Sequence, residues 1–292
     1  MKRPKSLLVV IERTASTPTH LAKALVLARA LPAQVELFLC DSEQAYVLGH
    51  AYDRDGVLKA RAASLTEARR YLGELRDTSG ARDVEMAIDA ECESPLYESI
   101  VRKVLRSAPD IVVKAIAADA HKPAMPDPND WQLVRTCPVT VILTRSRTWR
   151  TPPRLAAAID VSDAEPEEFA RSVMEAGVLL AEVVRAELHI VYGERGPEAG
   201  ARERLAKLQR LCAEAGIGHD RTHVVPGVPE QSLPRFVAAQ GYDALVLGAL
   251  AHRAAGTTPV GTLTSTLLDS LECDFVLVKP SGYSGPPSPS ER

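Results

Sequence analysis

The chain has 292 residues, 46% of them apolar and 25% charged, which is enough for two globular domains of about 150 residues each. The 35 basic and 38 acidic residues give a net charge of −3, and aromatic residues make up only 4%, so no nucleic-acid partner is expected. Apolar runs fall well short of the roughly 18 residues that cross a bilayer, and the five cysteines are scattered without a CxxC pair. We therefore expect a cytoplasmic protein with reduced thiols and no membrane insertion.

In chain order, the first half alternates predicted strands and helices. Apolar runs bounded by polar or turn residues predict strands within residues 7–11, 34–39, 84–88, 110–114 and 137–143. Apolar residues at helical spacing predict helices at 21–30, at 55–76, after the N-cap Ser94 and first-turn Pro95, and near Trp131. The segment TWRTPP at 148–153 is predicted to join the two halves.

The second half repeats this order. Its predicted strands lie within residues 155–159, 188–191, 222–225, 244–247 and 273–279, and its helices at 167–184, at 201–215, at 229–240 and from Gly261-Thr262 onward. Residues 7–12, 110–114 and 137–143 match 155–160, 243–248 and 273–279, at separations of 148, 133 and 136 residues. The pattern predicts an internal duplication, with domains at 1–150 and 151–282 and a disordered tail at 283–292. Alternating strands and helices with continuous apolar strands predict an α/β fold: two tandem open parallel sheets with helices on both faces.

A candidate anion site follows the fourth strand of the second half. The apolar run there ends on Gly248, and the later Gly261-Thr262 pair opens a helix whose first turn is rich in small and hydroxyl residues. Unpaired backbone N–H groups and the helix dipole favour a phosphate at such an end. Because ligands of open sheets lie beyond the carboxyl ends of the strands, Asp160 is expected to meet Gly248 at one crevice, where it could accept from an adenine or ribose group. A turn or capping carboxylate is an equally open interpretation of Asp160.

These features carry a family resemblance. The duplicated layout, with GALAHRAAGTTPVGTLTS in the second half and NDWQLVRTCPV in the first, resembles the tandem-domain universal stress proteins over nearly the whole chain. The family's nucleotide motif is Gly, two residues, Gly, nine residues, Gly, then Ser, Thr or Asn. It falls here on Gly248, Ala251, Gly261 and Thr262, with alanine in place of the second glycine. The resemblance implies five parallel strands per half in the order 3-2-1-4-5, with the halves packed as a pseudo-dimer in the way that single-domain members form dimers.

The resemblance also implies the ligand: ATP or another adenine nucleotide, with Mg²⁺ only if the nucleotide brings it. The residues expected to bind it are Asp160, Val191, Leu247, Gly248, Leu250, Ala251, Gly261, Thr262 and Leu263. A Cβ at Ala251 costs roughly 1–2 kcal/mol if the loop needs a left-handed backbone, which would weaken a site about tenfold. His252 and Arg253 could add cationic contacts, or His252 could simply lie in a solvated loop.

The first half departs further from the family pattern. Lys114 stands where the second half has Gly248, no glycine occurs from there through Trp131, and Asp127 and Asp130 place negative charge where phosphate would lie. We predict no nucleotide there. Asp127 and Asn129 are expected to cap the helix near Trp131, and Lys114 is hypothesised to pair with Glu12.

Other chemistry is sparse. The sequence has no GxxxxGK[ST], GxGxxG or GxSxG motif and no HxxxH spacing, so no catalytic residue or dedicated metal site is predicted. His189 and His223 are expected to be packed or capping residues.

Three functions stay open. The favoured one is a stress-response protein that binds ATP with little or no turnover. The second is a nucleotide-independent scaffold or a binder of another, apolar ligand, and the weakest is a slow ATP hydrolase, for which no general base can be named. Whether the chain forms a homodimer is also left open.

Overall fold

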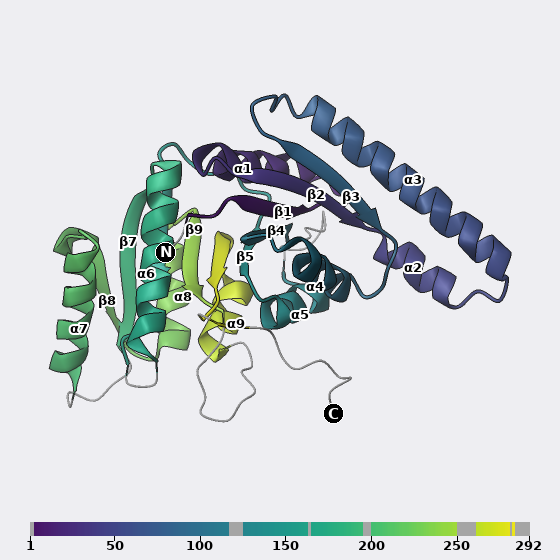
Figure 1. The fold of residues 1–292 in the computed structure, drawn as a ribbon. Helices are drawn as coiled ribbons and strands as arrows, with labels where there is room; N and C mark the ends of the chain where they lie inside the picture. The colour runs from purple at the N-terminus through teal and green to yellow at the C-terminus, as the bar shows by residue number, and fades with distance from the viewer. Residues whose placement is uncertain are drawn as a thin grey trace.

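One sheet runs through the whole protein (Figure 1). The computed structural model describes residues 3–116, 125–162, 165–194, 200–249, 261–280 and 282–283. The strands of the first half are β1 (Ser6–Val10), β2 (Gln34–Cys40), β3 (Met86–Glu91), β4 (Ile111–Ala115) and β5 (Thr140–Thr144). Those of the second half are β6 (Arg154–Ala158), β7 (Glu187–Glu194), β8 (Thr222–Pro226), β9 (Ala244–Gly248) and β10 (Asp274–Val278).

The strand order is β3-β2-β1-β4-β5-β10-β9-β6-β7-β8. Each half therefore has the order 3-2-1-4-5 with parallel neighbours, which confirms the predicted topology. The two halves do not form separate sheets, however. Strands β5 and β10 pair antiparallel, with Val141 opposite Leu277, and make the two sheets one.

Helices cover both faces of this sheet. In the first half they are α1 (Thr17–Ala30), α2 (Ser42–Gly49), α3 (Arg54–Thr78), α4 (Leu96–Ser107) and α5 (Pro128–Thr136). In the second they are α6 (Glu167–Val184), α7 (Ala201–Glu214), α8 (Pro229–Gln240) and α9 (Thr262–Ser270), with a 3-10 turn at His219–Arg221. One apolar cluster joins α1, α3, α6 and α7 to one face, and a second joins α4, α5, α8 and α9 to the other.

Strand β1 is a continuous apolar run in the sequence because both of its faces are buried. Leu7 and Val9 point into one cluster and Leu8 and Val10 into the other, because successive side chains of a strand alternate between faces. Each cluster contains residues of both halves, so the duplicated units share their cores.

The structure adds one helix that was not predicted and corrects one predicted cap. Helix α2 was not predicted, since none of its eight residues is buried and it therefore has no core-facing apolar stripe; Asp41 caps it by accepting from the Gln44 N–H at 3.2 Å. Ser94 is not the N-cap of α4; that position belongs to Pro95, without a side-chain cap.

A buried polar network crosses the junction between the halves. The Lys23 ammonium on α1 lies 2.6 Å from Asp274 Oδ2 at the start of β10. Asp274 also accepts from the Trp149 indole N–H at 2.8 Å and from the backbone N–H of Arg145 at 2.7 Å. The predicted joint at 148–153 is thus bound to both halves. Its Trp149 donates to Asp274 of the second half, and Asp274 pairs with Lys23 of the first half.

Two further observations concern the whole described chain. All five cysteines are free thiols. None of the helices in the described ranges is both long enough and apolar enough to span a membrane.

Candidate functional site

A pocket of about 600 Å³ opens at the carboxyl ends of β6 and β9. The chain leaves β6 toward β7 on one side, while β9 and β10 lie on the other, so this is the point where the strand order reverses. Open α/β sheets bind their ligands at such a point, and the volume is within the range of small-molecule sites.

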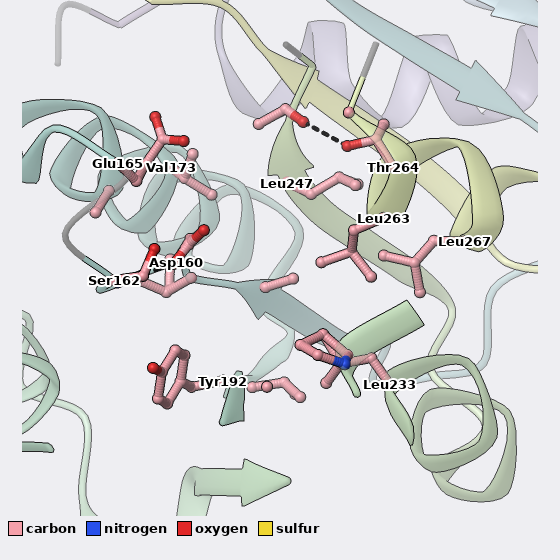
Figure 2. Close-up of a pocket in the computed structure, with 18 of the residues that line it drawn as sticks. Asp160, Ser162, Glu165, Val173, Tyr192, Leu233, Leu247, Leu263, Thr264 and Leu267 are labelled. Carbon is pink, nitrogen blue, oxygen red and sulfur yellow. Dashed lines mark hydrogen bonds between the residues drawn. The ribbon is translucent and has the colours of Figure 1, made fainter. Parts of the chain in front are cut away.

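Acidic side chains stand on one side of the pocket (Figure 2). Asp160 Oδ1 accepts from the backbone N–H of Ser162 at 2.8 Å, so the turn role considered for this carboxylate is real. Burial, and then the neighbouring charge of Asp160, raise the pKa of Glu165 to about 7. Asp160 is exposed and lines the pocket, which leaves it accessible to a ligand as well.

The end of β7 forms the adjoining wall. Arg204 on α7 reaches back to Glu194, with 2.7 Å between Nη2 and Oε1. Burial, and then the charge of Glu194, raise the pKa of Tyr192 to about 12, so its hydroxyl is a neutral donor at physiological pH. No sequence pattern indicates this group, because Glu194 and Arg204 lie ten residues apart on different elements.

Gly248 lies directly against an aromatic ring. A Cβ built on Gly248 would lie 2.6 Å from Cε1 of Phe169, far inside van der Waals contact. The missing side chain therefore makes room for the buried Phe169 ring, and both residues line the pocket.

The N-terminus of α9 faces the same pocket through Gly261, Thr262 and Leu263. Gly261 is the N-cap residue, and no side chain caps this end among the described residues. The Thr264 hydroxyl instead donates to the carbonyl of Gly248 at 3.0 Å and fixes α9 against β9 (Figure 2). The first-turn N–H groups thus lie at an end with partial positive charge.

Apolar side chains make up much of the remaining wall. Figure 2 shows Leu233, Leu247, Leu263 and Leu267 on the side away from Asp160. A ligand that fills the pocket would meet carboxylates at one end, backbone N–H groups at another and leucines between them.

Most of the predicted residues are brought together here. The residues of the predicted set that line the pocket are Asp160, Val191, Leu247, Gly248, Gly261, Thr262 and Leu263. Leu250 and Ala251 lie outside the described residues, as do His252 and Arg253. Phe169, Glu165, Tyr192, Leu233 and the Glu194–Arg204 pair were missed, since their relevance depends on helix packing.

The corresponding crevice of the first half is filled by its own side chains. Lys114 Nζ lies 2.8 Å from Glu12 Oε2 and 2.9 Å from Asp130 Oδ1, which confirms the predicted pair and adds a third member. Burial opposes the charge on Lys114, but Asp130 and Glu12 outweigh burial and raise its pKa, so the ammonium is fully charged.

Strand register corrects the predicted equivalence of Lys114 and Gly248. Leu7 lies opposite Ile111, and Leu155 lies opposite Ala244. Counting along each strand from these pairs, Lys114 corresponds to Leu247, and Gly248 corresponds to Ala115. The two ends differ because the segment from Asp243 to Gly248 has six residues and the segment from Asp110 to Lys114 has five.

Helix α5 closes the first-half site at the end that corresponds to α9. Asp127 caps it, as predicted, by accepting from the backbone N–H of Asp130 at 2.8 Å, and Asp130 accepts in turn from the Asp127 N–H at 3.0 Å. Asn129 does not cap this helix; its side-chain oxygen accepts from the N–H of Tyr97 at 3.5 Å. The positive helix end is therefore already neutralised by carboxylates.

Two histidines, His189 on β7 and His223 on β8, lie close to the β8 edge of the sheet. His189 Nδ1 and His223 Nε2 are 2.8 Å apart, and the rings stack with centroids 5.1 Å apart, so both are packed as predicted. No group of three or more His, Cys, Asp or Glu side chains within the described ranges is arranged to hold a metal ion.

The fold and the pocket together define a class of α/β protein: its sheet is covered by helices on both faces, and a pocket large enough for a small molecule lies where the strand order of the second half reverses. Residues 150–279 match the model of the Universal stress protein family, and this part of the chain is a universal stress protein domain. The full chain is similar to the Universal stress protein E homolog of Haemophilus influenzae: 24% identical over 304 residues, covering 95% of this chain and 98% of that protein.

Solved structures of the same fold extend over both halves. A functionally unknown protein from Pseudomonas aeruginosa PAO1 has a TM-score of 0.75 at 21% identity, with 96% of this chain and 94% of that chain covered. A universal stress protein from Archaeoglobus fulgidus has a TM-score of 0.65 at 14% identity, with 95% and 97% covered. At these identities the comparison establishes the architecture.

Proposed function

We propose that this protein acts in a cytoplasmic stress response by binding ATP or a related adenine nucleotide in the pocket of its second half, with little or no turnover. One observation carries the proposal: no side chain in the described ranges caps the N-terminus of α9, which faces a pocket of about 600 Å³, whereas the corresponding helix α5 is capped by Asp127. Backbone N–H groups at a helix N-terminus bind phosphate well.

The pocket chemistry suits such a ligand in one orientation. Phosphates would lie against Gly261, Thr262 and Leu263, because Asp160 and Glu165 repel them from the other side. The base and ribose would then occupy the space between the leucines and Asp160, whose carboxylate can accept from a hydroxyl or an amino group. Any Mg²⁺ would arrive with the nucleotide.

Calorimetric titration with ATP tests this function. The parent is expected to release or absorb heat, and Gly261→Glu, which places a carboxylate at the helix end, is expected to give a flat trace. Asp127→Asn, which alters the equivalent cap of the first half, is the matched control and should bind as the parent does. Flat traces for the parent would contradict the proposal.

A second candidate, binding of a non-nucleotide apolar ligand, is favoured by the leucine-rich wall and by the Phe169 ring beside Gly248. Native mass spectrometry of the purified protein distinguishes the two, since a retained ligand would be identified by its mass. Hydrolysis is the weakest candidate, because Glu165 stands on the Asp160 side of the pocket rather than beside α9. Phosphate release above that of a Thr262→Ala variant would support it.

We further propose that the β5–β10 junction does within one chain what dimer formation does between two single-domain proteins. Its support is the antiparallel pairing of the two last strands and the shared cores on both faces.

A further inference from the structure

A titratable contact lies between the sheet and α8 in the second half. His189 Nδ1 on β7 and His223 Nε2 on β8 lie 2.8 Å apart, and the His223 ring contacts Phe236 of α8 with 5.2 Å between the ring centroids. A hydrogen bond between two imidazole nitrogens needs one nitrogen that carries a proton and one that does not. The contact therefore exists only while at least one of the two rings is uncharged.

The groups around the pair can balance one added proton but not two. Glu187 Oε1 lies 3.1 Å from His189 Nε2, but Arg154 Nη2 lies 3.4 Å from the same nitrogen, and the other oxygen of Glu187 is already paired with Arg154 Nε at 3.3 Å. The Tyr242 ring lies 5.4 Å from His189, and burial raises the pKa of Tyr242 to about 12, so it supplies no charge. Burial, followed by the charges of His189 and Arg154, lowers the pKa of His223 below its ordinary value of 6.5. A second proton is therefore taken up only with loss of the contact.

The first half has an ion cluster at the same place. Glu36 and His189 are each the third residue of their strand, and in both halves the next residue of that strand pairs with the residue before Asp89 or His223. Strand register thus makes Glu36 the counterpart of His189 and Asp89 the counterpart of His223. Lys103 of α4 bridges the two carboxylates, with Nζ 2.7 Å from Glu36 Oε1 and 2.8 Å from Asp89 Oδ2.

Helix α8 is the counterpart of α4, and Phe236 stands at the position of Lys103. Buried apolar side chains recur every four residues in both helices, and Lys103 and Phe236 each follow the middle one, Ile100 or Leu233, by three residues. Opposite charges therefore hold α4 on the sheet, whereas α8 lies on an uncharged pair. Carboxylates and ammonium groups ordinarily keep their charges between about pH 5 and pH 8, where histidine titrates. Only α8 is expected to respond to acid in this range.

Helix α8 also forms part of the pocket wall. Leu233, one turn before Phe236, lines the pocket, and so does Val191, two residues after His189 on the same face of β7. We propose that the His189–His223 contact makes the second half acid-sensitive: it holds α8 on the sheet near neutral pH, and uptake of a second proton loosens α8 and releases the ligand of the pocket. Ligand release rests on the proposed function, whereas the loosening of α8 does not.

Hydrogen exchange of the full chain tests the loosening. After correction for the intrinsic effect of pH on exchange, amides of α8 in the parent should exchange about tenfold faster at about pH 5.5 than at about pH 7.5, the effect of one pKa unit. Amides of α4 are the internal control and should show no such change, because Lys103 holds that helix through two carboxylates. An α8 that does not respond, or an α4 that responds equally, would overturn the proposal.

Two variants separate the histidine pair from general acid sensitivity. His223→Gln keeps a hydrogen-bonding group but cannot become a cation, and His189→Glu/His223→Asp/Phe236→Lys copies the first half. The acid response of α8 should disappear in both. The imidazole signals of the parent, followed by NMR over the same range, should show that the two rings gain protons in separate steps. A response of α8 that persists in His223→Gln would overturn the proposal.

Calorimetric titration with ATP at both pH values tests ligand release. Between about pH 7.5 and about pH 5.5 the affinity of the parent should fall about tenfold more than that of His223→Gln. Comparing the two proteins removes the contributions of Glu165 and of the nucleotide phosphates, which titrate in the same range with either protein. Equal falls would overturn ligand release. Absence of binding at both pH values, with the α8 response present, would overturn the proposed nucleotide function and support the acid-sensitive contact by itself.

Discussion

Lys114 and Glu12 form an ion pair, with 2.8 Å between Nζ and Oε2, at the place in the first half that corresponds to the pocket of the second. The ammonium is almost completely buried and also meets Asp130. A protein cation thus occupies the crevice that is open in the other half, where Leu247, Asp160 and Thr264 stand at the corresponding positions.

Removal of this cation should be strongly destabilising. In Lys114→Met the carboxylate of Asp130 is left buried without its partner, so we expect the free energy of unfolding at neutral pH to fall by about 3–5 kcal/mol. Burial would then raise the pKa of Asp130 unopposed, so part of the loss should be regained at low pH. Urea denaturation at neutral and acidic pH measures both effects. In the triple variant Glu12→Asp/Lys114→Leu/Asp130→Thr, which copies the second half, most of the loss should disappear; equal losses in both variants would contradict the account.

The buried pair at the junction should matter more than a surface pair of similar length. Lys23→Met leaves the carboxylate of Asp274 buried beside β10, so a loss of about 3–5 kcal/mol is expected. Arg29→Met breaks an ion pair with Asp83 whose members are about half exposed, and a loss below about 1 kcal/mol is expected. Comparable losses for the two variants in urea denaturation would show that the junction network contributes no more than a surface contact.

Gly248 should tolerate a methyl group only if Phe169 is reduced. Gly248→Ala forces its Cβ against the Phe169 ring and should cost about 1–3 kcal/mol of unfolding free energy. In a Phe169→Leu background the same substitution should cost clearly less, because the ring atoms are gone. A double-mutant cycle by urea denaturation measures the coupling, and strictly additive effects would refute the contact as the reason for the glycine.

Glu165 should make stability depend on pH. Its pKa is about 7 in the folded protein against an ordinary value of 4.5, so the folded state holds the proton more tightly than the unfolded chain. The resulting stability is complete below 4.5 and is lost as the pH rises through 7. Relative to Glu165→Gln, the parent should lose clearly less than about 3 kcal/mol, the loss that a shift of this size gives without screening, because Glu165 is only half-buried and solvent screens its charge. The loss should fall between about pH 5 and pH 8. Parallel pH profiles of the two proteins would exclude this role.

Much of the architecture was predictable because it depends on local patterns. Helices α6 and α8 begin and end at the predicted residues, and the strand order followed from a resemblance carried by duplicated strand and loop segments. Lys114 and Glu12 could be paired because both end parallel strands whose carboxyl ends share one edge. Helix α2 could not be predicted, since it has no buried side to leave a periodic signal.

The sequence by itself determined two copies of one α/β unit and the helix end that could hold an anion, because apolar periodicity and glycine spacing are properties of the chain itself. The strand order within each unit was what the family resemblance implied. Only the tertiary structure decided that β5 and β10 fuse the sheets, that Asp130 completes the ion cluster around Lys114, and that Gly248 packs against the Phe169 ring. These contacts join residues far apart in the chain, and their distances are set by how helices pack on the sheet rather than by any local pattern.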